Sequence, residues 1–131
     1  MYPKQGDIFW VNIPKRHTEG SEQYGRRPFI VMSRDALNKG CKAVVAVPMT
    51  TYQGQINDAS IAANQPPFRI VIPGAEIAKD PTCNIVLSLG VAKTDQVRVI
   101  DKTRLEGKLG TLSKTAVISV GLGLAWVFDL R

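Results

Sequence analysis

The chain has 131 residues, of which 44% are hydrophobic and 21% are charged. This length suffices for one domain with its own apolar core, and we expect a single domain over residues 1–131. Seventeen lysines and arginines against eleven aspartates and glutamates give a net charge of +6, which favours anionic partners such as nucleic acid. The basic residues are spread along the chain, so the sequence does not indicate a disordered basic tail.

The sequence also argues against a zinc centre, a secreted protein and a membrane protein. Cys41 and Cys83 are far apart and His17 is the only histidine, which leaves no set of zinc ligands. The first residues lack the apolar core of a signal peptide. The longest apolar stretch, residues 116–128, is shorter than the roughly 20 residues that span a bilayer. We therefore expect a cytoplasmic protein with reduced thiols.

Three strands are predicted in the first half of the chain, because three short runs of β-branched and aromatic residues lie between turn signals. In chain order they are residues 8–13, 29–33 and 43–47. A polar loop at residues 15–27 joins the first two, and Pro28 fixes the backbone where the second begins. A turn is expected at residues 38–40. The run 43–47 has the composition of a strand buried on both faces.

The second half begins with a long polar loop. Residues 48–51 are expected to end the third strand, and the loop at residues 52–67 is long enough to be functional or disordered. Three more strands are predicted, with an irregular stretch at residues 74–82 between the first two and Gly90 as a bulge or kink between the last two. They are residues 68–73, 84–89 and 91–100.

Two helical segments complete the chain. Asp101 is expected to cap one short turn of helix, and Ser113 a final helix that ends near Phe128. The final helix is apolar on nearly all faces, and Gly121 and Gly123 weaken its intrinsic propensity, so packing must stabilise it. The elements predict a mostly β, predominantly antiparallel, barrel-like sheet covered by one C-terminal α-helix.

The loop before the second strand concentrates polar chemistry. Ser21, Glu22, Arg26 and Arg27 bring a hydroxyl, a carboxylate and two guanidiniums to the mouth of a buried strand. A guanidinium offers five donors in a plane and can bind a phosphate through two hydrogen bonds at once.

Four segments occur in a characteristic order. They are Gly6-Asp7-Ile8-Phe9-Trp10-Val11; Gly20-Ser21-Glu22-Gln23 with Gly25 and Arg27-Pro28; Val47-Pro48-Met49-Thr50-Thr51; and Asp95-Gln96-Val97-Arg98-Val99-Ile100-Asp101-Lys102 with Arg104-Leu105. In these segments the chain resembles the MazF/PemK (Kid) family of toxin endoribonucleases from bacterial type II toxin–antitoxin pairs, over essentially its whole length. The resemblance implies an SH3-like β-barrel with a C-terminal helix, the fold shared by the CcdB and PemK toxins.

The resemblance further implies a homodimer that cuts single-stranded mRNA at a short sequence without metal or cofactor. The ribose 2′-hydroxyl attacks the neighbouring phosphorus and leaves a 2′,3′-cyclic phosphate and a 5′-hydroxyl. The implied protein partner is a small acidic antitoxin, MazE-like, that lies across the RNA groove. DNA is an indirect partner, through the toxin–antitoxin complex at its promoter, and no membrane is involved.

Arg27 and Thr50 are the main catalytic positions that the resemblance implies. Arg27 stabilises the charge on the scissile phosphate, and Thr50 donates to a nonbridging oxygen. The alternatives are that Arg27 only pairs with Glu22 and that Thr50 only caps its strand. Glu22 either accepts a proton or orients Arg27.

Two further catalytic positions depart from the family pattern. Ser21 stands where some relatives carry a histidine, and it is expected to shape the loop. Asp95 matches an aspartate proposed as the base in the PemK/Kid branch, but the arginine two residues earlier is here Lys93, which keeps the charge and loses the bidentate fork. Asp95 and Lys93 lie either in the active groove or at the barrel edge.

Six residues are expected to bind RNA, mostly by holding the phosphate backbone. They are Arg16, Gln23, Arg26, Thr51, Lys93 and Gln96. For Arg26 the alternative is that it faces solvent. Two other functions stay open at this point: a DNA gyrase poison like the related CcdB family, and a catalytically inactive SH3-like module that binds nucleic acid or protein. The matches at Arg27-Pro28 and Thr50 favour RNA cleavage.

Overall fold

The computed structural model of the chain describes residues 2–17, 19, 20, 25–52, 65–85, 87 and 89–130. The predicted site residues Ser21, Glu22 and Gln23 lie outside the described residues, as does most of the predicted loop 52–67. Of Thr51 only the backbone is described.

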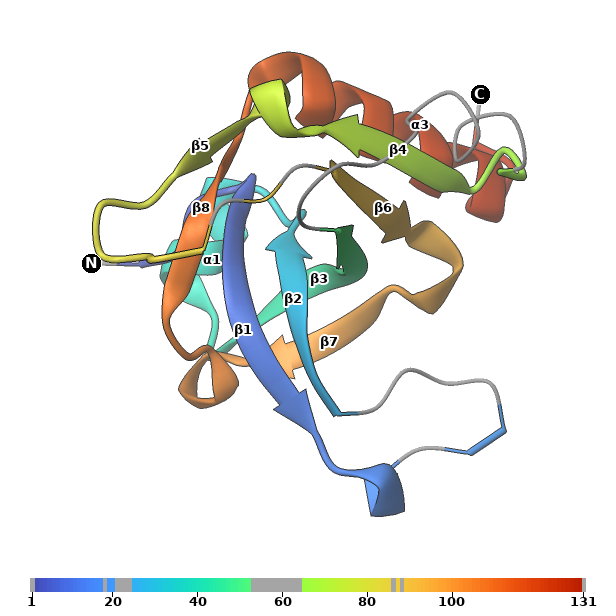
Figure 1. The fold of residues 1–131 in the computed structure, drawn as a ribbon. Coiled ribbons are helices and arrows are strands. Elements are labelled where there is room, and N and C mark those ends of the chain that lie inside the picture. Colours follow the sequence, from blue (N-terminus) through green and yellow to red (C-terminus); the bar gives the residue numbers. More distant parts are fainter. Residues whose placement is uncertain are drawn as a thin grey trace.

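Eight strands form one bent sheet in this part of the chain. They are β1 (Asp7–Ile13), β2 (Gly25–Val31), β3 (Ala43–Tyr52), β4 (Arg69–Pro73), β5 (Ile77–Lys79), β6 (Leu89–Lys93), β7 (Arg98–Asp101) and β8 (Lys108–Leu112). Their order is β4-β6-β3-β2-β1-β8-β5, with β7 paired to β3 outside this path, and every pairing is antiparallel. Figure 1 shows the sheet curling into a half-open barrel.

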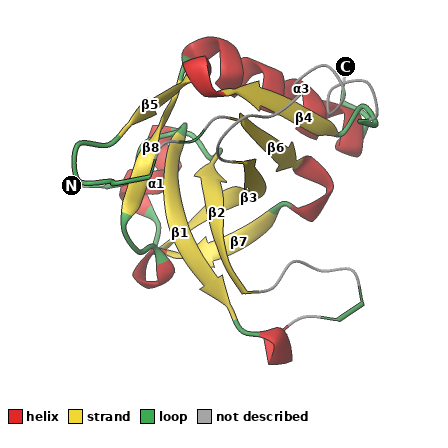
Figure 2. Cartoon of the chain, viewed as in Figure 1, coloured by secondary structure: helices red, strands yellow, loops and turns green. Residues whose placement is uncertain are grey.

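Helices are few, and most are single turns. The described helices are α1 (Asp35–Gly40), α3 (Lys114–Phe128) and four 3-10 turns, η1 (Lys15–His17), η2 (Gly74–Glu76), η3 (Thr94–Gln96) and η4 (Lys102–Arg104). In Figures 1 and 2, α3 lies across the top of the barrel beside β4. The expected class, a mostly antiparallel β-barrel with a C-terminal helix, is confirmed.

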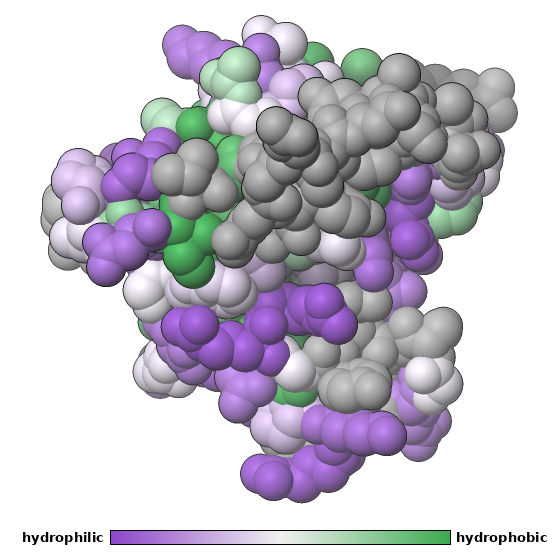
Figure 3. All heavy atoms as spheres, viewed as in Figure 1, coloured by the Kyte–Doolittle hydropathy of each residue, from purple (hydrophilic) through white to green (hydrophobic). Residues whose placement is uncertain are grey.

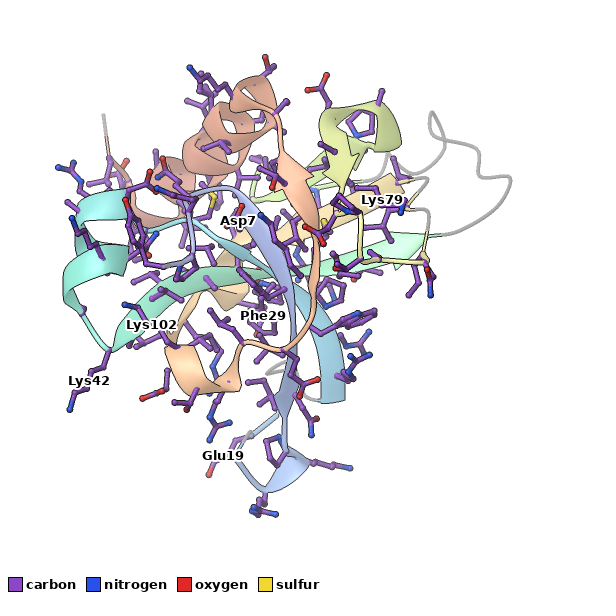
Figure 4. The ribbon with its side chains drawn as sticks, turned by 90° about the vertical axis from the view of Figure 1, so that its left-hand side faces the viewer. Asp7, Glu19, Phe29, Lys42, Lys79 and Lys102 are labelled. Carbon is purple, nitrogen blue, oxygen red and sulfur yellow. The ribbon has the colours of Figure 1, made fainter. Side chains whose placement is uncertain are left out.

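Two apolar clusters stabilise the barrel. The first holds Ile8, Met49 and Ala92, and the apolar side chains of α3 pack onto it. The second is centred on Phe29, which is fully buried and lies in the middle of the barrel in Figure 4. Complete burial of a side chain of this size stabilises the fold by about 1.5–3 kcal/mol.

The Gly6-Asp7 motif has a structural role at the start of β1. Gly6 adopts a φ of 95°, a conformation that favours glycine. Asp7, next to it, is buried and accepts a hydrogen bond from the Thr111 hydroxyl at 3.0 Å. It also forms an ion pair with Lys108 Nζ at 3.2 Å. These contacts join β1 to β8, and Figure 4 shows Asp7 between these strands.

Two predicted strand ends were wrong, and both corrections concern the site. β2 begins at Gly25, so Arg26 and Arg27 belong to a strand, where they pair with β1. β3 continues through residues 48–52, because at Pro48 it exchanges β2 for β6 as its partner and keeps its extended backbone. Local sequence does not reveal such a change of partner.

Other predictions differ from the structure in its less regular parts. The expected turn 38–40 is instead the end of helix α1. The side chain of the buried Asn38 holds this helix in place by donating to the Ser33 carbonyl at 2.8 Å. The described residues of the segment 84–88 are not in a strand, and Gly90 lies inside the regular strand β6. The strands β5 and β8 were not predicted, because both are short and weakly patterned.

The predicted helix caps are confirmed. The Asp101 carboxylate accepts from the Thr103 backbone N–H at 2.9 Å, at the start of η4. The Ser113 hydroxyl accepts from the Ala116 backbone N–H at 3.1 Å, at the start of α3. Each cap satisfies an amide that the helix itself leaves without a partner.

Helix α3 is seated by a close approach at Gly123. A Cβ atom at this position would lie 2.9 Å from side-chain carbons of both Ile70 and Thr94. The helix therefore lies directly on β4 and η3. Its outer face stays exposed although it is apolar, with Ile118 64% and Leu122 66% accessible.

Candidate active site

The site begins where β3 changes its partner. Phe29 pairs with Pro48 in the last rung between β2 and β3, and Met49 opens the pairing of β3 with β6. Arg27 lies two residues before Phe29, and Thr50 lies two residues after Pro48. Beyond this rung β3 pairs with β6 in place of β2, so the two strands diverge. Arg27 and Thr50 therefore lie on the two arms of one fork, between β2 and β3.

The β3 arm of the fork continues sideways into the strands β6 and β4. Thr50 pairs with Val91 of β6, and Lys93, two residues further along β6, pairs with Arg69 of β4. Because side chains alternate along a strand, Thr50, Lys93 and Arg69 share one face of this sheet. The opposite face carries Met49 and Ala92 into the first apolar cluster.

Arg27, Lys93 and Arg69 form a cluster of positive charge. Burial, and then the charges of Arg69 and Arg27, lower the pKa of Lys93, while Asp95 acts in the opposite direction. Both guanidiniums therefore lie close enough to Lys93 to disfavour its charge. We call these three residues the cation cluster.

Asp95 is the carboxylate beside the cation cluster. It receives two hydrogen bonds from Arg69, Nε to Oδ1 at 3.0 Å and Nη2 to Oδ2 at 3.3 Å, and one from Gln96 Nε2 at 3.4 Å. Burial alone would raise the pKa of Asp95, but the hydrogen bonds and the charge of Arg69 outweigh it, so the pKa is lowered. Asp95 is thus ionised at neutral pH and forms an ion pair with Arg69.

Thr94 fixes the end of β6 against the start of β4. It is fully buried, and its hydroxyl and backbone N–H both donate to the Phe68 carbonyl, at 2.6 and 3.2 Å. Lys93 and Asp95, on either side of Thr94, are therefore attached to a rigid point of the fold.

The structure places Arg26 apart from the cation cluster. The side chain of Arg26 lies on the opposite face of β2 from that of Arg27. There its Nε donates to Glu106 at 3.0 Å, and its guanidinium lies 4.3 Å from the Trp10 ring centre. Arg16 is exposed in η1, at the outer end of the β1–β2 hairpin. Figure 3 shows hydrophilic residues gathered over this lower end of the molecule. RNA binding by Arg16 and Arg26 stays a prediction.

The remaining predicted residues divide between described and undescribed parts of the chain. Gln96 contacts Asp95, as given above, and the Thr51 backbone pairs with Gly90. Ser21, Glu22 and Gln23 lie outside the described residues, and so does the alternative pairing of Arg27 with Glu22.

Arg69 was missed by the sequence analysis. The sequence predicted only that it belongs to the strand 68–73. The available signal was the replacement of an arginine by Lys93, which leaves Asp95 without a bidentate donor in its own segment. The structure supplies that donor from the neighbouring strand β4.

Three further findings bear on the class of protein. Among the described residues, no three His, Cys, Asp or Glu side chains are grouped so that they could hold a metal ion. The helices in that part of the chain include none that is long and apolar enough to cross a membrane. Cys41 and Cys83 are both free thiols, the first exposed and the second buried.

Comparisons with known proteins identify the family of the chain. Residues 4–128 match the family described as PemK-like, MazF-like toxin of type II toxin-antitoxin system. The endoribonuclease MazF of Staphylococcus saprophyticus is 30% identical over 127 residues, which cover 92% of each chain.

Solved structures agree in fold. The crystal structure of MazF (Form-I) from Deinococcus radiodurans has a TM-score of 0.69 and 23% identity, with 98% coverage of both chains. A mycobacterial endoribonuclease in complex with its cognate antitoxin has a TM-score of 0.63 and 21% identity, over 98% of this chain and 97% of that one. The chain therefore belongs to the PemK-like, MazF-like toxins of type II toxin–antitoxin systems and is an endoribonuclease of that family.

Proposed function

We propose that this toxin cuts single-stranded mRNA at a short sequence and that the scissile phosphate binds in the fork between β2, β3 and β6. The observation that carries the proposal is the cation cluster of Arg27, Lys93 and Arg69, which shares this fork with the Thr50 hydroxyl. Cleavage of RNA through its own 2′-hydroxyl needs positive charge and donors around a phosphate that gains charge in the transition state.

The proposed reaction is a transphosphorylation. The 2′-oxygen loses its proton and forms a bond to phosphorus, while the bond from phosphorus to the 5′-oxygen breaks and the departing 5′-oxygen takes up a proton from water. The products are a 2′,3′-cyclic phosphate and a 5′-hydroxyl. Arg27 and Lys93 offset the charge on the nonbridging oxygens, and Thr50 donates a hydrogen bond to one of them.

The 2′-proton passes to a carboxylate, for which Glu22 and Asp95 are the candidates. The lowered pKa of Asp95 makes it a weaker base than an ordinary aspartate, so its proposed role is to hold Arg69 in place. Glu22 is then the better candidate for the base, and Ser21 shapes the loop that carries it. Gln23, Thr51 and Gln96 are proposed to contact the RNA around the cut.

Metal-independent cleavage is part of the proposal, because the cation cluster supplies the positive charge that a divalent ion would otherwise provide. The test is incubation with RNA in excess EDTA, followed by sequencing of the 5′-ends. We expect undiminished cleavage and 5′-hydroxyl ends. Dependence of the rate on added Mg²⁺ or Mn²⁺ would overturn the mechanism.

A small acidic antitoxin is the proposed protein partner. Related structures contain a mycobacterial endoribonuclease with its cognate antitoxin and a MazE-MazF pair from Deinococcus radiodurans. With a net charge of +6, this chain is suited to an acidic polypeptide that covers the RNA groove, and the complex of the two would carry the contact with promoter DNA. The site of action is the cytoplasm, where mRNA is found.

A homodimer is proposed on the outer face of α3. Ile118 and Leu122 are exposed one turn apart, and residues 116–128 include no charged side chain. An uncharged apolar face can pair with the same face of a second copy about a two-fold axis. Sedimentation should give twice the mass of the chain, and Leu122→Glu should give the single mass.

A further inference from the structure

Helix α3 carries an exposed ring at one end and has a hollow beside the other. The ring is that of Phe128, the last residue of the helix, which is 58% exposed. The hollow measures about 490 Å³ and is lined by the apolar side chains of Leu112, Val117 and Ile118 and by polar residues that include Lys114. It lies where α3 follows β8 (Figure 1), and it has room for an aromatic side chain.

The ring and the hollow lie on the same side of α3. Phe128 follows Val117 by eleven residues, which is about three full turns of an α-helix, so the two side chains project in nearly the same direction. They are roughly 16 Å apart along the helix axis, and Phe128 therefore cannot fill the hollow of its own protomer. The midpoint between them is at Leu122, which is 66% exposed on the face proposed above for a second copy.

The last turn of α3 is held against its own protomer. The close approach at Gly123 seats the helix on β4 and η3, and the Trp126 ring lies 5.4 Å from the Phe68 ring, centre to centre. Phe128 is therefore presented in a fixed position. Binding by a side chain that the fold already holds costs little conformational entropy.

The charges at the two ends of α3 favour one direction of packing for a second helix. Lys114 is the first residue of α3 and Asp129 is its C-cap, and both are exposed. A cation at the N-terminus and an anion at the C-terminus each oppose the dipole of their own helix. An antiparallel copy would place each charge near the opposite charge of the partner and near the end of the partner's dipole that attracts it. A parallel copy would place like charges together.

We infer that two copies of the chain pack their α3 helices antiparallel about a two-fold axis at Leu122, so that Phe128 of each copy fills the hollow beside Val117 of the other. The inference rests on the homodimer of the proposed function and adds the direction of the helices and the side chain that anchors them. A two-fold axis perpendicular to the helix exchanges its ends and keeps its sides, which brings the ring of one copy to the hollow of the next. The contact then occurs twice in the dimer.

Disulfide formation tests this arrangement. Cysteines replace Val117 and Phe128 together in a Cys41→Ser background, because Cys41 is an exposed thiol. We expect a disulfide-linked dimer on mild oxidation, since the two positions are too far apart within one chain to be bridged. Val117→Cys alone and Phe128→Cys alone should stay unlinked, because an antiparallel pair holds equal positions about 16 Å apart. Linkage of Phe128→Cys to itself would show parallel helices and overturn the inference.

A control at the two-fold axis separates this inference from the homodimer on which it rests. Leu122→Cys should link to itself whichever way the helices run, and therefore reports only that α3 is the interface. A dimer in which Leu122→Cys links and the pair at positions 117 and 128 does not would overturn the inference and leave the homodimer standing. A wild-type protein that sediments with the single mass would contradict the homodimer itself.

The affinity of the dimer measures the contribution of the ring. By sedimentation, Phe128→Ala should weaken dimerisation about a hundredfold, and so should Val117→Phe, which fills the hollow from within its own chain. The double variant should lose little more than either single variant, because both changes remove the same contact. Val99→Ala is the matched control, since Val99 is 65% exposed on β7, and it should dimerise like the wild type. Wild-type affinity in Phe128→Ala, or losses that add in the double variant, would overturn the inference.

Discussion

Two arginine–carboxylate pairs lie on this molecule in different settings. Arg26 and Glu106 join β2 to the segment before β8, with side chains 53% and 45% exposed and a single contact at 3.0 Å. Arg69 and Asp95 join β4 to η3, with side chains 28% and 29% exposed and two hydrogen bonds. Lys93, another cation, lies beside the second pair.

The difference shows what makes a charged pair useful for binding. An exposed pair in water contributes only about 0–1 kcal/mol to stability, and its charges cancel. The half-buried pair holds a guanidinium in a fixed orientation next to a second cation, Lys93. The adjacent residues Arg26 and Arg27 are divided between these settings, since alternate faces of β2 lead to Glu106 and to the cation cluster.

The largest expected effect is on the rate of RNA cleavage, and it distinguishes Arg27 from its neighbour Arg26. Arg27→Ala should lower the rate of RNA cleavage about 10²–10³-fold, because it removes charge stabilisation from the transition state. Arg26→Ala should change the rate only a few-fold. Single-turnover cleavage of a synthetic RNA measures both, and thermal unfolding is the control for folding. Similar losses in the two variants would contradict the assignment of Arg27 to the fork.

The hydroxyl of Thr50 should have the next largest effect. Thr50→Val keeps the shape of the side chain and removes one hydrogen bond to a charged group, so a loss of about 10–100-fold in kcat is expected. Thr50→Ser should retain most of the activity. A Thr50→Val enzyme with the wild-type kcat would show that the hydroxyl serves only the strand end.

A smaller effect is expected when Arg69, which donates two hydrogen bonds to Asp95, is replaced. Arg69→Lys should lower kcat/KM about tenfold, because an ammonium cannot hold Asp95 through two parallel hydrogen bonds. Adding Lys93→Arg should recover part of this loss, since residues 69 and 93 are opposite each other on neighbouring strands. Additive losses in the double variant would show that an arginine at position 93 cannot replace Arg69 as the donor to Asp95.

The smallest effect concerns stability and pH. The folded protein lowers the pKa of Asp95 below its ordinary value of 3.8, so its ion pair stabilises the fold above that pH, and this contribution is lost as the pH falls through the folded value. Asp95→Asn should therefore lower the free energy of unfolding at pH 7 by about 1 kcal/mol or less. Urea unfolding at pH 7 and in strong acid measures it. A difference that persists in strong acid would have another cause.

Local patterns predicted much of this fold. The caps at Asp101 and Ser113, the strand before Pro14 and the apolar final helix each follow from a few neighbouring residues. The strand β8 was missed, because Lys108–Leu112 is short and contains Gly110, which weakens a strand pattern.

The site was less predictable, because it depends on pairings between distant segments. Arg27 and Thr50 were chosen from a family resemblance, and nothing local places them on the two arms of one fork. The contact of Arg69 with Asp95 requires β4 to pair with β6, and that of Phe68 with Trp126 requires α3 to lie on β4. Neither pairing can be read from the residues that take part in it.

The central claim is that one phosphate of the RNA binds between Arg27 and Thr50. A crystal structure of the protein with an uncleavable 2′-deoxy analogue of its substrate tests this most directly. We expect the scissile phosphate within about 3 Å of both the Arg27 guanidinium and the Thr50 hydroxyl, the distance of a charge-assisted hydrogen bond. A scissile phosphate bound elsewhere, with neither side chain in contact with it, would contradict the account.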